Sequence, residues 1–214
     1  MRQNNSNFIV SWNNIYLNKG LEYHSPLENI NDLVNLYTSN KRLKILDVGC
    51  GCGKHLEVLA KKGHEVYGID ISNEALNLAK DNFKKKNLDG HFTCQSIYTR
   101  LPFEANSFNF IICLRTIHHS NQKDILDLIK EFKRILVSNG MIYITIPKVN
   151  LRKKPITKIK KIANRTFLNL EGNEKNVIHF IYNQSILIKH FADFDKKIWV
   201  SDDHYYHLLG VLKK

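Results

Sequence analysis

Three glycines and two cysteines form the segment of this sequence best suited to bind a ligand. Gly49, Gly51 and Gly53 alternate with the cysteines directly after the apolar run 44–48, which is typical of a buried strand, and before a helical pattern. Glycines at alternate positions permit a tight turn and let a ligand approach the backbone without a Cβ in the way. Asp47 precedes the loop by two residues, where a carboxylate would repel a pyrophosphate but suits a ligand that carries an ammonium group.

A second acidic residue, Asp70, follows Gly53 by 17 residues at the end of the next strand-like run, 65–69. A carboxylate at this place can accept both hydroxyl groups of a ribose. The glycine spacing G-x-G-x-G differs from the G-x-G-x-x-G of dinucleotide sites, and no G-x-x-x-x-G-K-S/T run is present, which excludes a Walker nucleotide site. The order of acid, glycine loop and acid predicts a ligand site; the alternative is a plain turn with a helix-capping aspartate.

Strand-like and helical patterns alternate along the chain and predict the sheet that positions these residues. The expected strands are 44–48, 65–69, 91–94, 108–114, 141–146, 194–200 and 204–212. The expected helices are 55–62, 73–87, 123–137 with Asn139-Gly140 as its end, and 184–191. This alternation predicts an α/β fold with a doubly wound, parallel sheet and helices on both faces, whose ligands bind at the carboxyl ends of the strands.

The composition is that of one globular domain, or of one domain with a substantial appendage. The chain has 214 residues, of which 43% are hydrophobic and 24% charged. No apolar stretch approaches the roughly 18–20 residues of a membrane helix, and the first residues show no export signal. We therefore expect a cytoplasmic protein, with no membrane span and with its four cysteines as free thiols.

The net charge of +12 points to an anionic partner or to a lysine-rich composition. Lysine supplies most of this charge, whereas arginine, which binds phosphate oxygens in pairs, is scarce. The segment 152–165 holds seven basic residues and no acid. Ile156, Ile159 and Ile162 recur at every third position, which predicts a helix with one apolar and one basic face. The basic face is a solvated surface, a site for a small anion, or a site for RNA; the scarcity of arginine favours the first two.

These motifs resemble those of the class I S-adenosylmethionine-dependent methyltransferases, in the group with the type 11 methyltransferase domain. The first and second motifs of that family resemble LDVGCGCG and GIDIS, and the stretches through its fourth and fifth strands resemble LPFEANSFNFIICLRTIHH and EFKRILVSNGMIYITIP. The resemblance covers residues 43–147. It implies a Rossmann-like sheet with an antiparallel last strand in a domain spanning 44–214. We expect residues 1–43 to form an N-terminal helical lid and 149–182 a basic insertion that acts as a second lid.

The resemblance also implies S-adenosylmethionine as the cofactor. The glycine backbone would pass under its methionine part, with Asp47 near the amino group, Asp70 on the ribose and Ile71 against the adenine. Many relatives have an acid where this chain has Ile97, so packing and backbone contacts are expected to hold the adenine there. The expected cofactor-binding residues are Asp47, Gly49, Cys50, Gly51, Gly53, Asp70, Ile71, Ile97, Tyr98 and Leu114.

The candidate catalytic residues follow the fourth strand. Methyl transfer is an in-line displacement, so the protein must align the acceptor and, where needed, take a proton from it. His118 and His119 stand where a base or an orienting group can act, unless one ring only caps the next helix. Arg115 either binds an acceptor carboxylate or phosphate or faces solvent. We expect no metal site, because the ten histidines show no complete metal-ligand signature.

Aromatic and imidazole side chains outside the central pattern are candidates to cover the site. Trp12, Tyr16 and Tyr23 are expected to cover the cofactor cleft or to dock the first helix on the sheet. A second set falls in the C-terminal third and is expected over the same opening: His179, Tyr182, His204 and His207.

Two activities and one inactive state fit these features. The first is methyl transfer to an oxygen or nitrogen of a small-molecule, anionic acceptor enclosed by the two lids. The alternative is methylation of tRNA. The basic segment and a distant similarity to wobble-uridine methyltransferases favour it, whereas the lack of a recognisable appended RNA-binding domain disfavours it. The third, a cofactor-binding scaffold, is disfavoured by the intact glycine loop and Asp70. The sequence therefore predicts a small-molecule methyltransferase.

Overall fold

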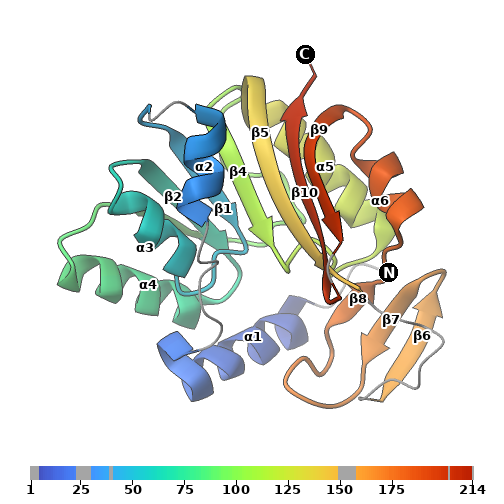
Figure 1. The fold of residues 1–214 in the computed structure, drawn as a ribbon. Helices are drawn as coiled ribbons and strands as arrows, with labels where there is room; N and C mark the ends of the chain where they lie inside the picture. Colours follow the sequence, from blue (N-terminus) through green and yellow to red (C-terminus); the bar gives the residue numbers. More distant parts are fainter. Residues whose placement is uncertain (1–4, 23–29, 39–40, 149–157, 202, 214) are drawn as a thin grey trace.

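The computed structural model describes residues 5–22, 30–38, 41–148, 158–201 and 203–213, which are arranged around a sheet of seven strands (Figure 1). The strands lie in the order β3-β2-β1-β4-β5-β10-β9. Their bounds are β1 Lys44–Val48, β2 Glu65–Asp70, β3 His91–Cys94, β4 Phe108–Leu114, β5 Leu136–Pro147, β9 Phe194–Ser201 and β10 Tyr205–Leu212.

Strand direction confirms the predicted fold class. Strands β1 to β5 run parallel, and β10 runs antiparallel between β5 and β9. The chain builds outward from β1 to β3 and then restarts on the other side with β4, so the switch point lies between β1 and β4. Doubly wound sheets bind their ligands at this point, outside the carboxyl ends of the strands. The fold is the expected Rossmann-like α/β fold with an antiparallel last strand.

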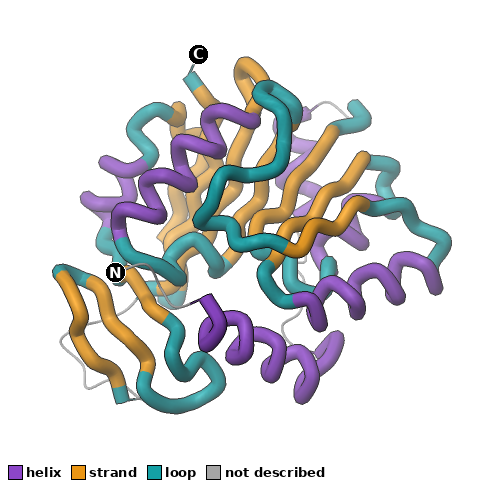
Figure 2. Tube along the Cα trace, turned by 180° about the vertical axis from the view of Figure 1, so that it is seen from behind, coloured by secondary structure: helices purple, strands orange, loops and turns teal. Residues whose placement is uncertain are grey.

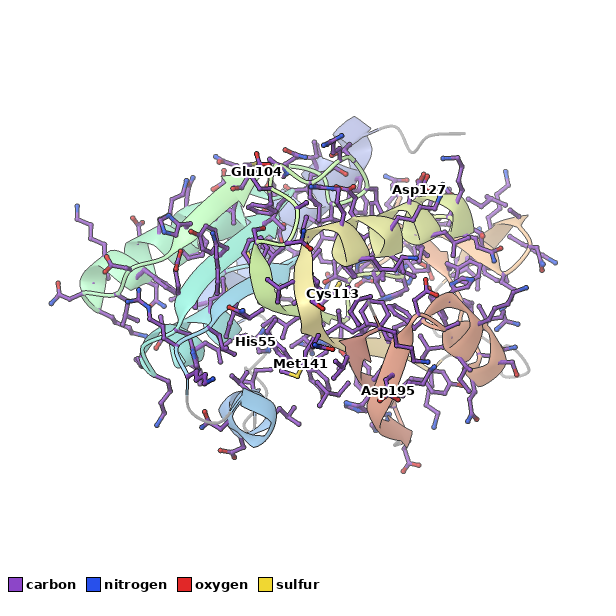
Figure 3. The ribbon with its side chains drawn as sticks, turned by 90° about the horizontal axis from the view of Figure 1, so that it is seen from above. His55, Glu104, Cys113, Asp127, Met141 and Asp195 are labelled. Carbon is purple, nitrogen blue, oxygen red and sulfur yellow. The ribbon has the colours of Figure 1, made fainter. Side chains whose placement is uncertain are left out.

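Helices cover both faces of the sheet (Figures 1 and 2). One apolar cluster joins the sheet to α2, α3 and α4, and another joins it to α5 and α6. In Figure 3, Met141 of β5 points to the side of α2, and Asp127 lies on the outer side of α5. The helix bounds are α1 Asn5–Lys19, α2 Ile30–Thr38, α3 Lys54–Ala60, α4 Asn73–Lys85, α5 Gln122–Ile135 and α6 Gln184–His190, with a short 3-10 helix at Gly20–Glu22.

Side-chain caps fix where three of these helices begin. Ser72, Asn121 and Asn183 each accept a hydrogen bond from a backbone N–H in the first turn of α4, α5 and α6. Such caps satisfy one of the N–H groups that have no partner within a helix. Ser72 and Asn121 follow β2 and β4, so these two caps also set the points at which the chain turns back from the carboxyl edge of the central sheet.

The predicted end of the fifth helix is wrong. The helix ends at Ile135, and Leu136 is already extended and pairs with Phe108. Asn139 has a φ of +57° and lies in an irregular stretch of β5, since the next pair in the register joins Phe110 to Met141. Asn139-Gly140 therefore permits a bulge within a strand rather than a stop after a helix.

The insertion contains a second sheet of three antiparallel strands, β6 Ile159–Ala163, β7 Thr166–Asn169 and β8 Ile178–Phe180, in that order. The predicted basic helix is therefore wrong over the strand β6. Arg165 has a φ of +53°, which turns the chain back so that β6 pairs with β7. The β-branched isoleucines of this segment also favour a strand. The part of the predicted helix before residue 158 lies outside the described residues.

Helix α1 and the small sheet lie side by side below the carboxyl edge of the central sheet, and both ribbon views show this (Figures 1 and 2). Ser11 of α1 donates a hydrogen bond of 2.6 Å from Oγ to the carbonyl of Lys175, in the loop between β7 and β8. Tyr23 lies outside the described residues. Among the described helices, none is long and apolar enough to cross a membrane.

Candidate active site

A cavity of about 400 Å³ lies at the carboxyl edge of the central sheet, within the size range of small-molecule sites. Its lining comes from α1, the loop after β1, the ends of β2, β4 and β5, and the loop before β8. All of the residues predicted for the cofactor and for catalysis line it, except Gly53, which is the N-cap residue of α3. The residues predicted from the sequence motifs therefore line one cavity.

The glycine loop has a backbone that other residues could not adopt. Gly49 and Gly51 have φ values of +77° and +52°, in the left-handed region. A Cβ on Gly49 would lie 2.3 Å from Thr116 Cγ2, and a Cβ on Gly51 would lie 2.1 Å from the hydroxyl oxygen of Tyr16. The bare backbone therefore allows both the turn after β1 and the close approach of α1.

Asp70, at the end of β2, is held by backbone hydrogen bonds. Its Oδ2 accepts from the N–H of Gly51 at 2.8 Å, and its Oδ1 accepts from the N–H of Ser72 at 2.9 Å. Burial raises the pKa of this carboxyl, and the N–H groups of Ser72 and Gly51 oppose that rise. Since each carboxylate oxygen can accept more than one hydrogen bond, the group can also bind two neighbouring hydroxyls in the cavity.

Asp47 and His55 form a buried pair at the other end of the glycine loop. Asp47 is 1% exposed, and its Oδ2 lies 3.6 Å from His55 Nδ1. Within the part of the chain that the structure describes, neither this Oδ2 nor His55 Nε2 has a hydrogen bond. Because a buried carboxylate oxygen without a donor is costly, the pair suits a ligand that brings an ammonium group. Sequence reasoning missed His55; its place two residues after Gly53, in the first turn of α3, was the available signal.

The segment after β3 lines the cavity beyond Ile71 with an apolar and a phenolic side chain. Ile97 is buried, and the hydroxyl of Tyr98 donates to the carbonyls of Thr116 and Ile117, at 3.2 and 3.3 Å. Burial raises the pKa of Tyr98, so its hydroxyl stays protonated. Tyr98 therefore ties the segment after β3 to the turn after β4, and the residue at position 97 offers packing where many relatives have a charge.

Three imidazoles meet at the opposite end of the cavity. His118 and His119 follow β4 and are 4% and 5% exposed, and His179 comes from β8. The ring centroids are 4.1, 5.2 and 4.9 Å apart for the pairs 118–119, 118–179 and 119–179. Burial lowers the pKa of both His118 and His119 well below its ordinary value, which leaves both rings neutral near pH 7. Trp12 of α1 lies 5.0 Å from the His119 ring.

Backbone contacts fix this cluster in place. The N–H of Phe180, next to His179, donates to the carbonyl of His118 at 2.8 Å. Asn121, not a histidine, caps α5, so the two rings after β4 remain directed to the cavity. His179 lines the same cavity, as expected, but its contact with the other two rings was not predicted, because 60 residues separate it from His119.

Arg115 occupies a strained position at the end of β4. Its φ is +57°, a region that residues other than glycine rarely adopt. Its N–H donates both to the carbonyl and to the hydroxyl of Thr145, at 3.0 and 3.1 Å, which anchors this conformation to β5. Strain of this kind is frequent at functional sites, and Arg115 lines the cavity.

Three of the four C-terminal candidates lie elsewhere. Tyr182 belongs to the core and bonds to His190 at 3.1 Å, His207 bonds to the Tyr143 hydroxyl at 3.0 Å, and His204 is exposed. The residue that lines the cavity from this region is Tyr205. The lining also includes side chains that the sequence did not single out, among them Phe8, Lys54, Thr116 and Glu174.

Comparison with known proteins bears on the class of protein to which this fold belongs. A family model described as a methyltransferase domain matches residues 45–140. An uncharacterized protein of Methanocaldococcus jannaschii is 31% identical over 160 residues, which are 74% of this chain and 65% of that protein. A ubiquinone biosynthesis O-methyltransferase of Coxiella burnetii is 37% identical over 75 residues, 35% of this chain and 32% of that protein. The matches thus span less than two thirds of the length of these relatives.

A crystal structure of an S-adenosylmethionine-dependent methyltransferase from Methanosarcina mazei shares the fold, with a TM-score of 0.69 at 23% identity over 84% of this chain and 96% of that one. The sheet order and the glycine loop at its switch point define a class I methyltransferase. Residues 45–140 therefore belong to the methyltransferase-domain family, and the fold is the one seen in this S-adenosylmethionine-dependent methyltransferase.

The described residues fit this cofactor at two points. The buried Asp47 Oδ2 without a hydrogen bond matches its ammonium group. The Asp70 carboxylate, fixed by Gly51 and Ser72, matches its ribose hydroxyls. Between them the bare backbone of the glycine loop borders the cavity. The histidine cluster lines the same cavity.

Proposed function

We propose that this methyltransferase acts on an oxygen or nitrogen atom of a small-molecule acceptor. The observation that carries the proposal is the size of the cavity and the partial cover that α1 and the loop before β8 give it. The hydrogen bond from Ser11 to the Lys175 carbonyl joins α1 to that loop, and Trp12 and Glu174 line the cavity beside this junction. A small molecule fits a partly covered cavity of about 400 Å³, whereas a folded RNA needs a broad open groove.

The residues of this chain divide the work of the reaction between the two ends of the cavity. When bound, S-adenosylmethionine supplies a methyl group already activated on a sulfonium. Asp47 and Asp70 would hold the ammonium and the ribose, which fixes the direction of transfer. Trp12 excludes water from the acceptor end. His118 and His119 are neutral, so either ring can orient the acceptor atom or accept a proton from it.

Charge at the acceptor end favours an acceptor with an anionic group. Arg115 lines the cavity on the same turn as the histidines, and a guanidinium binds a carboxylate or phosphate through two hydrogen bonds. The relative that is 37% identical over 75 residues is named as a ubiquinone biosynthesis O-methyltransferase, so its own acceptor atom is an oxygen. Phe8, Trp12 and Tyr205 add aromatic surface that suits a flat ring.

The position of the basic strand argues against the RNA alternative. The side chains of Lys158, Lys160 and Lys161 are exposed on or beside β6, the outer strand of the small sheet. None of the three lines the cavity, which β8 reaches from the other edge of that sheet. An RNA held by these lysines would have to cross the small sheet to reach the cofactor.

A methyl-transfer assay with radiolabelled S-adenosylmethionine tests the proposal. One pool of acceptors holds hydroxylated aromatic acids and amino acids, and the other holds total tRNA. We expect label in the small-molecule pool alone. Label in tRNA alone would contradict the proposal, and calorimetry that finds no binding of the cofactor or of its demethylated product would contradict the activity itself.

A further inference from the structure

The three imidazoles at the acceptor end offer one nitrogen each to a common point. One ring nitrogen of His118, one of His119 and one of His179 all lie within 4.8 Å of one another. The first two follow β4 and the third comes from β8, so two separate sheets bring them together. Three nitrogens of a tetrahedral zinc site lie about 3.4 Å apart, as bond lengths near 2.1 Å require. Side-chain rotations that move each nitrogen by roughly 1 Å would bring the three nitrogens to this spacing.

Two ring nitrogens of this cluster are buried without a hydrogen bond among the described residues. His118 Nδ1 has no partner among the described residues, and His179 Nε2 has no hydrogen bond of acceptable geometry although Glu174 Oε2 lies 3.1 Å away. Buried polar atoms are nearly always paired, so such atoms require an explanation. Two unpaired imidazole nitrogens that share a cavity with a third, beside a carboxylate, have the composition of a cation site rather than of a core.

We propose that His118, His119 and His179 form a binding site for one divalent transition-metal ion. Imidazole nitrogen selects zinc, cobalt, nickel or iron over magnesium and calcium. Three protein ligands leave a coordination position open, which is the arrangement of catalytic rather than structural zinc sites. The negative charge of Glu174 beside His179 favours a cation at this point.

The open position would face the acceptor. A metal ion there would bind an acceptor oxygen, lower the pKa of its proton so that the proton passes to solvent, and fix the distance of that oxygen from the cofactor. With the ion bound, His118 and His119 act as ligands in place of a base. This role, unlike the metal site itself, rests on the proposed function. The sequence alone predicts no metal site, because the ligands come from the pair after β4 and from an insertion 60 residues further along the chain.

Cobalt binding tests the site without reference to activity. Tag-free protein, treated with a chelator and dialysed, is titrated with Co²⁺, whose visible absorption bands report nitrogen ligands. We expect one ion per chain, displaced by Zn²⁺. The single variants His118→Gln, His119→Gln and His179→Gln each lose at least about 10–100-fold in affinity, the range already seen for residues that only support a ligand.

A matched variant separates this site from adventitious binding. His91 of β3 stacks on the ring of Tyr67 of β2 and does not line the cavity, so His91→Gln should leave cobalt affinity unchanged. Circular dichroism of each variant checks that the fold is intact. Binding that survives in the three cluster variants, or that is lost in His91→Gln, overturns the proposal.

A parallel titration with S-adenosylhomocysteine distinguishes the two proposals. Protein that binds this product but neither cobalt nor zinc overturns the metal site and leaves the methyltransferase function standing. Protein that binds metal but not the product leaves the site standing and contradicts the cofactor assignment. Loss of methyl transfer on chelation, restored by zinc, would then place the ion in the reaction.

Discussion

At the scale of single residues, Asp70 connects the fold to the cofactor. Its two oxygens are fixed by the N–H groups of Gly51 and Ser72, so the glycine loop and the end of β2 are held in one arrangement before any ligand arrives. A carboxylate fixed in this way loses little freedom when it accepts the ribose hydroxyls, which favours affinity.

Replacing this carboxylate should weaken cofactor binding more than it weakens the fold. We expect Asp70→Ala to cost about 1–3 kcal/mol of binding free energy for S-adenosylhomocysteine, because charge-assisted hydrogen bonds are lost. Calorimetry gives the affinity, and thermal unfolding shows whether the loop has moved. Asp81→Ala, an exposed site on α4, is the control. Equal affinity for the Asp70 variant and the wild type would remove Asp70 from the cofactor site.

A second prediction for a single residue concerns Gly51, because the hydroxyl oxygen of Tyr16 lies close to it. A Cβ there would lie 2.1 Å from the Tyr16 hydroxyl oxygen, and the φ of +52° adds strain. Gly51→Ala should therefore lower the free energy of unfolding by about 1–3 kcal/mol. Adding Tyr16→Phe removes the clashing oxygen, so the double variant should recover part of the loss in urea unfolding. A double variant no more stable than Gly51→Ala would show that the clash is not the cause.

At the scale of elements, the half-buried carboxylate of Glu57 ties α3 to α4. Glu57 of α3 accepts from Lys61, from Asn82 at 2.7 Å and from Lys86, also at 2.7 Å. Burial alone would raise the pKa of Glu57, but these hydrogen bonds outweigh it and lower the pKa to about 2. The carboxylate of Glu57 therefore joins α3 to α4, and it loses its charge only in acid.

This tie should contribute to stability at neutral pH and lose its contribution in acid. A folded pKa of about 2 below an ordinary value of 4.5 means that the charged form is favoured in the folded state. Its contribution is complete above about pH 4.5 and disappears as the pH falls toward 2. Glu57→Gln should lower the free energy of unfolding by about 1–3 kcal/mol at pH 7 and by much less at pH 3. Urea unfolding at both values checks this. Glu104→Gln, at an exposed position, should show no such change, and a Glu57 effect independent of pH would contradict the assignment.

The elements also show how far the sequence could predict the structure. The buried strands β1, β2 and β4 and the capped helices were predictable, because apolar runs and cap residues act locally. The prediction at Asn139-Gly140 was wrong because this dipeptide can end a helix or permit a bulge in a strand. The pairing of Leu136 with Phe108, a tertiary contact, selects the bulge. Strand β6 was read as a helix because three isoleucines at every third position fit a helical face, while the turn at Arg165 and the partner β7 are tertiary features. His179 escaped assignment to the cluster for the same reason.

At the scale of the whole molecule, charge and chemistry lie on different sides of the small sheet. The net charge of +12 is concentrated locally in the segment that ends in β6, yet the cavity meets this sheet at the loop before β8 and at His179. The small sheet thus presents one histidine, His179, to the cavity at one edge and lysines to solvent at the other. Its basic edge also protects the molecule, because lysines on an outer strand discourage pairing with another chain.

This separation predicts that the basic edge can be neutralised without loss of chemistry. In the triple variant Lys158→Gln, Lys160→Gln and Lys161→Gln, kcat/KM for a small acceptor should stay within about twofold of the wild type, because none of the three lines the cavity and salt screens exposed charges. Affinity for tRNA, if measurable at low salt, should fall in the variant and lose part of its salt dependence. Lys84→Gln with Lys85→Gln, on α4, controls for net charge. A tenfold or larger loss of kcat/KM for the small acceptor in the triple variant alone would mean that this edge takes part in acceptor binding. A loss confined to the methylation of tRNA would restore RNA as the substrate.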